Sequence, residues 1–79
     1  MDDWRERVIY ERADLHVKLF KLLEFLGSEK INALNTAEQQ RLRAQAAAMV
    51  QYSDALTRRI DNFFDTLTDT VNANHQPAN

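Results

Sequence analysis

The sequence predicts an all-α fold: an antiparallel two-helix hairpin with a longer second helix, assembling into a helical homo-oligomer. The 79 residues include one glycine and one proline, so few positions interrupt a helix. Apolar residues recur at alternating steps of four and three, which is typical of helices that pack along one side. A chain this short and without cysteine has neither a large core nor disulfides. Self-association is therefore expected to supply the missing apolar burial.

The first helix is expected over residues 3–26. Acidic residues at its start interact favourably with the positive end of the helix dipole. Gly27 suits the left-handed conformation that often follows the last turn of a helix. Residues 27–35 are expected to connect the helices, and within this connector Ile31 and Leu34 fill the end of the hairpin.

The second helix is expected over residues 36–71, and the helical domain over residues 1–72. Its start fits a capping box formed by Asn35 and Glu38, or alternatively one residue later by Thr36 and Gln39. The final segment, residues 73–79, contains the proline and is expected to form a disordered tail.

Each helix has an apolar seam along one side. The seam of the first helix consists of Val8, Arg12, Leu15, Leu19, Leu22 and Leu26, and that of the second of Leu42, Ala46, Met49, Ser53, Leu56, Ile60, Phe63 and Leu67. Antiparallel pairing is expected to bring together residues whose numbers add up to about 64, so that Arg12 faces Ser53 and Asp54. The first helix also has a second apolar row, formed by Ile9, Ala13, His16, Phe20 and Leu23.

The second helix is expected to extend beyond its partner, since a rise of ~1.5 Å per residue makes it roughly 50 Å long against about 36 Å for the first helix. Only Trp4 of the first helix lies near enough to cover any of this overhang, which carries Phe63, Phe64, Leu67 and Val71. A single copy would leave them exposed to water. The predicted oligomer interface therefore consists of Trp4, Ile9, Phe20, Leu23, Phe63, Phe64 and Leu67, with Val71 at the end of the overhang.

Composition argues against several functions. Ten basic and twelve acidic residues do not give the positive field that DNA binding requires. No segment has the apolar length of a membrane span or the pattern of a secretion signal, so a cytoplasmic location is expected. No nucleophile motif, phosphate loop or metal motif is present, which argues against an enzyme and against a cofactor or metal. The acidic ladder of Asp61, Asp65 and Asp69 is interpreted as a solvated helix face.

The chain resembles a family of small tailed-phage proteins named after a gene of a crAss-like phage. Residues 5–63 carry the resemblance through Arg7-Val8-Ile9, Glu11, Leu15, Lys18, Lys21-Leu22, Phe25, Glu38-Gln39, Gln45, Met49, Tyr52, Leu56 and Arg59-Ile60. The helical-hairpin organisation is also similar to that of the anti-CBASS and anti-Thoeris sponges, phage proteins that capture the cyclic nucleotide signals of bacterial immunity. Those sponges form homo-oligomers, often hexamers, with ligand between protomers. The resemblance implies the same behaviour in the bacterial cytosol.

A sponge of this kind needs cationic groups for phosphates and flat side chains for bases. The candidate ligand-binding residues are Arg7, Tyr10, Glu11, Arg12 and Lys18 of the first helix, with Tyr52 and Arg59 at a similar level of the second helix. They would hold a small anionic nucleotide.

Each candidate has a structural alternative. Arg7, Lys18 and Arg59 fit a solvated face with ion pairs such as Arg7 to Glu11. Arg12 fits a buried pair with Asp54, and Tyr52 fits core packing. Trp4 fits an interface anchor better than a stacking platform, and His16 fits a packed or interfacial residue.

Two functions are consistent with these observations. The first is a phage anti-defence protein that sequesters a cyclic nucleotide without catalysis. The second is a helical module that docks the apolar overhang onto a phage or host protein.

Overall fold

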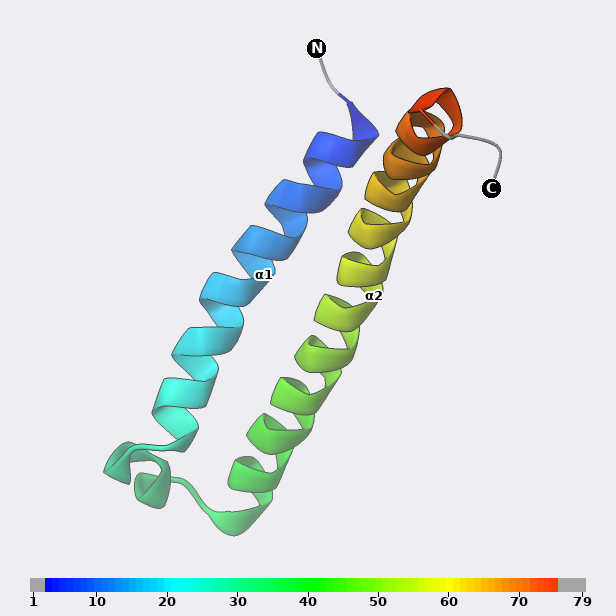
Figure 1. The fold of residues 1–79 in the computed structure, drawn as a ribbon. Coiled ribbons are helices and arrows are strands. Elements are labelled where there is room, and N and C mark those ends of the chain that lie inside the picture. The colour runs from blue at the N-terminus through cyan, green and yellow to red at the C-terminus, as the bar shows by residue number, and fades with distance from the viewer. Residues whose placement is uncertain (1–2, 76–79) are drawn as a thin grey trace.

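The chain folds into a single helical hairpin (Figure 1). The computed structural model describes residues 3–75, with side chains described for residues 3–63. Helix α1 spans Trp4–Leu26, a 3-10 helix η1 spans Glu29–Ala33, and helix α2 spans Thr36–His75. No strand occurs among residues 3–75. The predicted all-α hairpin with a longer second helix is confirmed.

Side-chain caps fix the start of each α-helix. The Asp3 carboxylate accepts a hydrogen bond from the Arg5 backbone N–H at 3.0 Å, and the Asn35 side chain accepts one from the Glu38 N–H at 2.8 Å. These bonds satisfy backbone donors that have no partner within a first helical turn. Of the two caps that the sequence allows, the structure contains the one made by Asn35, but the Glu38 carboxylate pairs with Arg41 at 3.0 Å and does not complete the capping box.

The turn after α1 does not use a left-handed residue. Gly27 has φ −88° and ψ 0°, which lies in the right-handed region, so the left-handed prediction was wrong. Ser28 makes the turn instead, because its hydroxyl donates to the Phe25 carbonyl at 2.8 Å and accepts the Lys30 N–H at 3.2 Å. The connector then continues into η1, where Ile31 is buried and Leu34 is half-buried just beyond.

Helix α2 ends at His75, four residues beyond the expected end at residue 71. Residues 73–75, which were assigned to a disordered tail, are therefore helical. No glycine or proline occurs between Thr36 and His75, so no helix-breaking residue interrupts α2 before its end. Phe64, Leu67 and Val71, which the sequence predicts to lie on the overhang, fall outside residues 3–63, whose side chains the structure describes.

The two helices pack about one turn out of the predicted register. Arg12 contacts Thr57, His16 contacts Ser53, and Trp4 packs on Phe63, so facing residue numbers add up to 67–69 rather than 64. The predicted contact of Arg12 with Asp54 is therefore wrong. A shift of one turn keeps both apolar seams in contact, so the main core cluster still comes from the predicted seams: Val8, Leu15, Leu56, Ile60 and Phe63, with Met49 packed against it.

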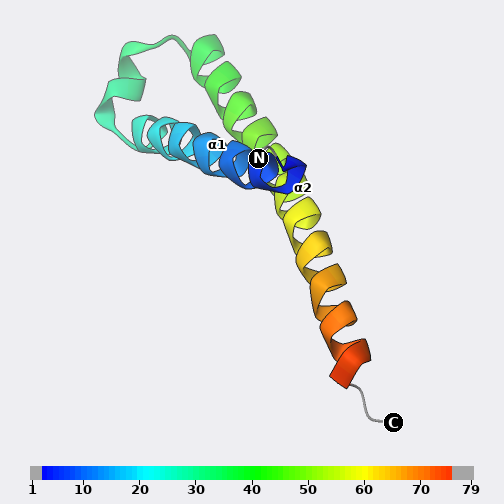
Figure 2. The same cartoon turned by 90° about the horizontal axis from the view of Figure 1, so that it is seen from above.

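The register also moves Phe63 into the hairpin. Its ring packs edge to face with that of Trp4, with centroids 5.8 Å apart and planes at 85°, and Phe63 is only 8% exposed. The expectation that Phe63 lies on an uncovered overhang is thus wrong. The overhang consists of residues 64–75, which Figure 2 shows continuing beyond the start of α1.

The hairpin is thin as well as long, with principal extents of 63 × 33 × 16 Å. A single layer of two helices has no third element to cover its sides. Both broad faces of the pair are open, and side chains that flank the seam lie on one face or the other. The two faces can therefore differ in chemistry.

Candidate ligand-binding face

Two polar contacts cross between the helices and show which sides of α1 and α2 adjoin. Arg12 Nη1 donates to Thr57 Oγ1 at 3.1 Å, and His16 Nε2 lies 2.6 Å from Ser53 Oγ in a second hydrogen bond. All four residues are half-buried. Because both contacts flank the apolar seam on the same side, they mark one face of the hairpin, and the opposite flanks of the two helices form the other face.

The α1 side of the face marked by His16 is largely apolar. Helical periodicity places Ile9, Ala13, Phe20 and Leu23 of α1 on it, because these residues follow His16 and each other at steps of three and four. Val50 of α2 lies on the same side, three residues before Ser53. This apolar face is therefore defined as Ile9, Ala13, His16, Phe20, Leu23 and Val50.

The opposite face carries most of the predicted ligand-binding residues. Arg7, Glu11 and Lys18 follow one another along α1 at steps of four and seven, and Tyr52 and Arg59 are seven residues apart on α2. Such spacings place side chains in a row. This charged face is defined as Arg7, Glu11, Lys18, Tyr52 and Arg59, and it is the strongest candidate for a functional site.

The side chains of the charged face are open to solvent. Arg7, Glu11 and Arg59 are exposed and form no ion pair with one another within the described side chains. Lys18 pairs with Asp14 at 3.2 Å, but both side chains are about 70% exposed, and such a pair contributes little. The Tyr52 side chain is 44% exposed, so its ring is not enclosed in the core. These groups can turn toward a ligand at low cost.

Two predicted ligand-binding residues do not join this face. Tyr10 is 70% exposed and points outward from α1, because it lies two residues, or about 200° of helix rotation, after the buried Val8. Arg12 lies at the seam on the side of the apolar face and already donates to Thr57. The partners His16, Ser53 and Thr57 were not predicted as a polar layer, although the steps of four between Arg12 and His16 and between Ser53 and Thr57 could have indicated it.

The strongest electrostatic perturbation lies outside the charged face. The Asp3 carboxylate forms side-chain hydrogen bonds with Arg5 at 2.9–3.2 Å, and these bonds, followed by the bond from the Arg5 backbone N–H, lower the pKa of Asp3. The same contact raises the pKa of Arg5. Both groups are at the start of α1, where they cap the helix.

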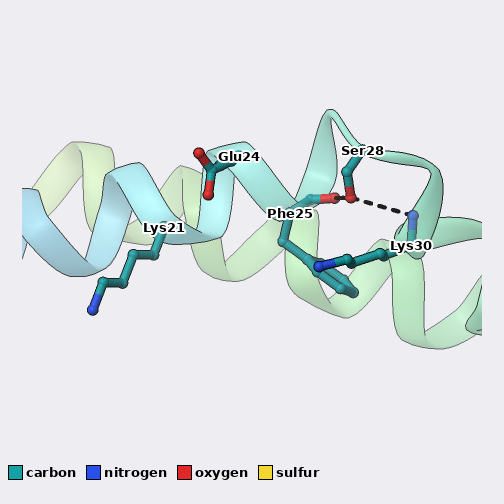
Figure 3. A pocket seen from close by; sticks show the side chains of 5 residues that line it. All are labelled: Lys21, Glu24, Phe25, Ser28 and Lys30. Carbon is teal, nitrogen blue, oxygen red and sulfur yellow. Dashed lines mark hydrogen bonds between the residues drawn. The ribbon is translucent and has the colours of Figure 1, made fainter.

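A shallow hollow of about 320 Å³ lies at the tip of the hairpin. Figure 3 shows its lining residues. The Ser28 hydroxyl is hydrogen-bonded to the Phe25 carbonyl and to the Lys30 backbone N–H, and the ammonium of Lys21 is directed away from Ser28. The lining consists of Lys21, Glu24, Phe25, Ser28 and Lys30. It includes no predicted ligand-binding residue, and its hydroxyl already has internal partners.

Within the described residues, no group of three or more His, Cys, Asp or Glu side chains could hold a metal ion. The helices of this part of the chain also lack a segment long and apolar enough to cross a membrane.

Comparison with known proteins gives one family. The family model described as Sequestin matches residues 2–62, which include all of α1, the connector and most of the part of α2 that packs against α1. No curated protein and no solved structure matches the chain. The family name denotes sequestration, which is a binding activity.

Proposed function

The chain belongs to the Sequestin family, and from this premise we propose that it is a non-catalytic phage counter-defence protein that sequesters a cyclic nucleotide immune signal between protomers of a homo-oligomer. The family match carries the proposal, because its name denotes sequestration. The charged face supplies the chemistry. Sequestration requires tight binding and no reacting group, which suits a surface of cations, one carboxylate and one tyrosine.

The groups of the charged face complement the parts of a cyclic nucleotide. Guanidinium groups such as those of Arg7 and Arg59 donate paired hydrogen bonds to phosphate oxygens. The exposed ring of Tyr52 offers a stacking surface to a base. Glu11 lies on the same row as Arg7 and can accept hydrogen bonds from base amino or ribose hydroxyl groups.

A second protomer would enclose the ligand. The hairpin is only 16 Å in its shortest extent, so one charged face forms one wall of a site rather than a cleft. Tight sites for small molecules bury most of the ligand surface. A charged face from another copy would supply the opposite wall and double the number of cations around the phosphates.

The direct test is a thermal-shift panel of cyclic dinucleotides, cyclic trinucleotides and cyclic ADP-ribose isomers. At least one of them should raise the melting temperature, because a ligand that binds only the folded state stabilises it. The bound compound should be recovered intact after the protein is denatured. A panel without stabilisation, or recovery of a cleaved product, would contradict non-catalytic sequestration.

Two neighbouring arginines provide a matched pair for locating the site. Arg59 is on the charged face, whereas Arg58 points outward and donates to the Asp54 carbonyl at 3.4 Å. Arg59→Ala should weaken ligand binding about 10- to 100-fold, the usual effect of losing a charge-assisted hydrogen bond, while Arg58→Ala should leave it nearly unchanged. Equal effects would show that the charged face is not the site.

The adaptor function remains the competing hypothesis. Helix α2 continues beyond Phe63 to His75, so an overhang exists, but Phe63 is covered by Trp4 and does not belong to it. Deleting residues 64–79 separates the two functions. Retained nucleotide stabilisation would favour sequestration through the charged face, and its loss would favour a role that depends on the overhang.

A further inference from the structure

The apolar face leaves several large side chains open to water. Phe20 is 64% exposed, and Ile9, Leu23 and Val50 are each about 40% exposed. Val17, at the outer edge of the same row, is 53% exposed. Scattered apolar residues are normal on a surface, but a continuous row along one side of a helix marks an interaction site.

The polar groups beside this row already have partners inside the hairpin. His16 is hydrogen-bonded to Ser53, and Arg12 donates to Thr57. A partner that covers the row therefore does not have to supply hydrogen bonds to His16 or Arg12, because their partners within the hairpin remain in place. The five residues of the row on α1, which are Ile9, Ala13, His16, Phe20 and Leu23, include no carboxylate and no lysine or arginine.

The sizes of the side chains along the row point to a second copy of the same chain. Ile9 and Leu23 lie equally far from His16 on either side, and small Ala13 on one side balances large Phe20 on the other. Parallel copies would place Ala13 opposite Ala13 and leave a gap. Antiparallel copies place Phe20 over the region of Ala13 and pair Ile9 with Leu23, which fills the interface evenly.

We propose that two copies associate through their apolar faces, with their α1 helices antiparallel and a twofold axis passing near His16 and Val17. This proposal rests on the homo-oligomer in the proposed function and specifies its partner surface. The face available is close to the size required: α1 is about 35 Å long and a helix pair about 20 Å wide, which gives roughly 700 Å² per copy. A typical stable interface buries about 800 Å² per partner.

The absence of cysteine from the sequence allows a clean cross-linking test. Val17→Cys places one thiol near the proposed axis, where it meets its own counterpart, so a short bis-maleimide should link most of the protein into dimers. Ala48→Cys is the matched control, because Ala48 is exposed on the opposite flank of α2. Circular dichroism should show unchanged helicity for both variants, since both positions are exposed.

A second pair of variants tests whether the two α1 helices of the dimer run antiparallel. Ile9→Cys alone should not cross-link to itself, because antiparallel helices separate the two thiols by about 20 Å. Refolding it together with Leu23→Cys should give mixed dimers in high yield. Self-linked Ile9→Cys without mixed dimers would show parallel helices and overturn the proposed geometry.

Sedimentation of the unmodified protein separates the failure of this interface from the failure of the proposed function. A stable oligomer in which Val17→Cys links no better than Ala48→Cys would overturn the apolar-face dimer and leave an oligomeric sponge intact. A monomer at micromolar concentration would overturn both. Phe20→Glu should raise the dimer dissociation constant by at least about 100-fold, because each change occurs twice across a twofold interface.

Discussion

The packing of Leu56 makes the Leu56→Ala variant the most direct test of the hairpin core. Leu56 is 1% exposed and contributes to the same cluster as Val8, Leu15, Ile60 and Phe63. Truncating a buried leucine to alanine costs about 2 to 5 kcal/mol, depending on how far the surroundings collapse. The hairpin is one layer thick, so the helices can close part of the cavity, and a loss of about 2 to 3 kcal/mol is expected.

This loss is a large fraction of the stability expected for a chain of this length, about 4 to 12 kcal/mol. Urea unfolding followed by circular dichroism measures it, provided that all variants are compared at one protein concentration, because association contributes to stability. Tyr10→Ala is the control: Tyr10 is 70% exposed and its change should stay within about 0.5 kcal/mol. A Leu56→Ala loss below about 1 kcal/mol, or one equal to that of the control, would refute the core as described.

Three further changes test the turn, the polar layer and the first cap. Gly27→Ala should stabilise the protein by about 0.5 kcal/mol in the same urea assay, because the backbone is right-handed and an added Cβ would lie 3.5 Å from the nearest atom; destabilisation would contradict this turn geometry. Ser53→Ala should cost about 1 to 2 kcal/mol, since His16 loses its 2.6 Å partner, whereas a neutral result would mean that the contact contributes nothing. The pKa of Asp3 is lowered from 3.8 by its hydrogen bonds to Arg5, so the charged cap stabilises α1 above about pH 4 and loses this effect as the pH falls below it. The protection factor of the Arg5 amide, which is the intrinsic exchange rate at each pH divided by the observed rate, should fall in acid in the native chain and change less in Asp3→Asn, which keeps the cap oxygen but not the charge.

The sequence was sufficient for the fold because its strongest signals are local. Heptad spacing identified the buried side chains of both helices, including Val8, Leu15 and Leu56, and the Asn35 cap marked the start of α2. The turn was predicted less well: a lone glycine suggested a left-handed residue, whereas the Ser28 hydroxyl provides hydrogen bonds that close the turn with Gly27 right-handed.

The register could not be obtained from the same pattern. Sliding one helix by a turn exchanges one seam residue for the next, so the apolar seams match almost equally well before and after the shift. The choice depends on the four polar residues at the seam, since only one register gives Arg12 and His16 the hydroxyls of Thr57 and Ser53. Buried polar groups without partners are costly, but this cost is visible only when both helices are placed together.

The sequence predicted only part of the candidate site, because closeness in sequence does not show which face of a helix a residue occupies. Closeness in sequence grouped Tyr10 and Arg12 with Arg7, Glu11 and Lys18, yet adjacent helical residues point in different directions. Arg7, Glu11 and Lys18, at steps of four and seven, stay on one face, whereas Tyr10 turns outward and Arg12 turns to the other side of the seam. The hairpin thus separates its chemistry, with the charged face on one side and the apolar face on the other.

This separation constrains how a sponge built from the hairpin can assemble. If two copies join through their apolar faces, each dimer presents two charged faces outward, and neither is covered by the dimer contact. A ligand site between protomers must then form where the charged faces of different dimers meet. The like-charged cations on such faces repel one another, and an anionic ligand between them removes this repulsion. A nucleotide from the panel that stabilises the protein should therefore also drive dimers into larger assemblies of even order, such as a hexamer of three dimers. Sedimentation velocity with and without that nucleotide measures the change, and a ligand-bound trimer or pentamer would be incompatible with this arrangement.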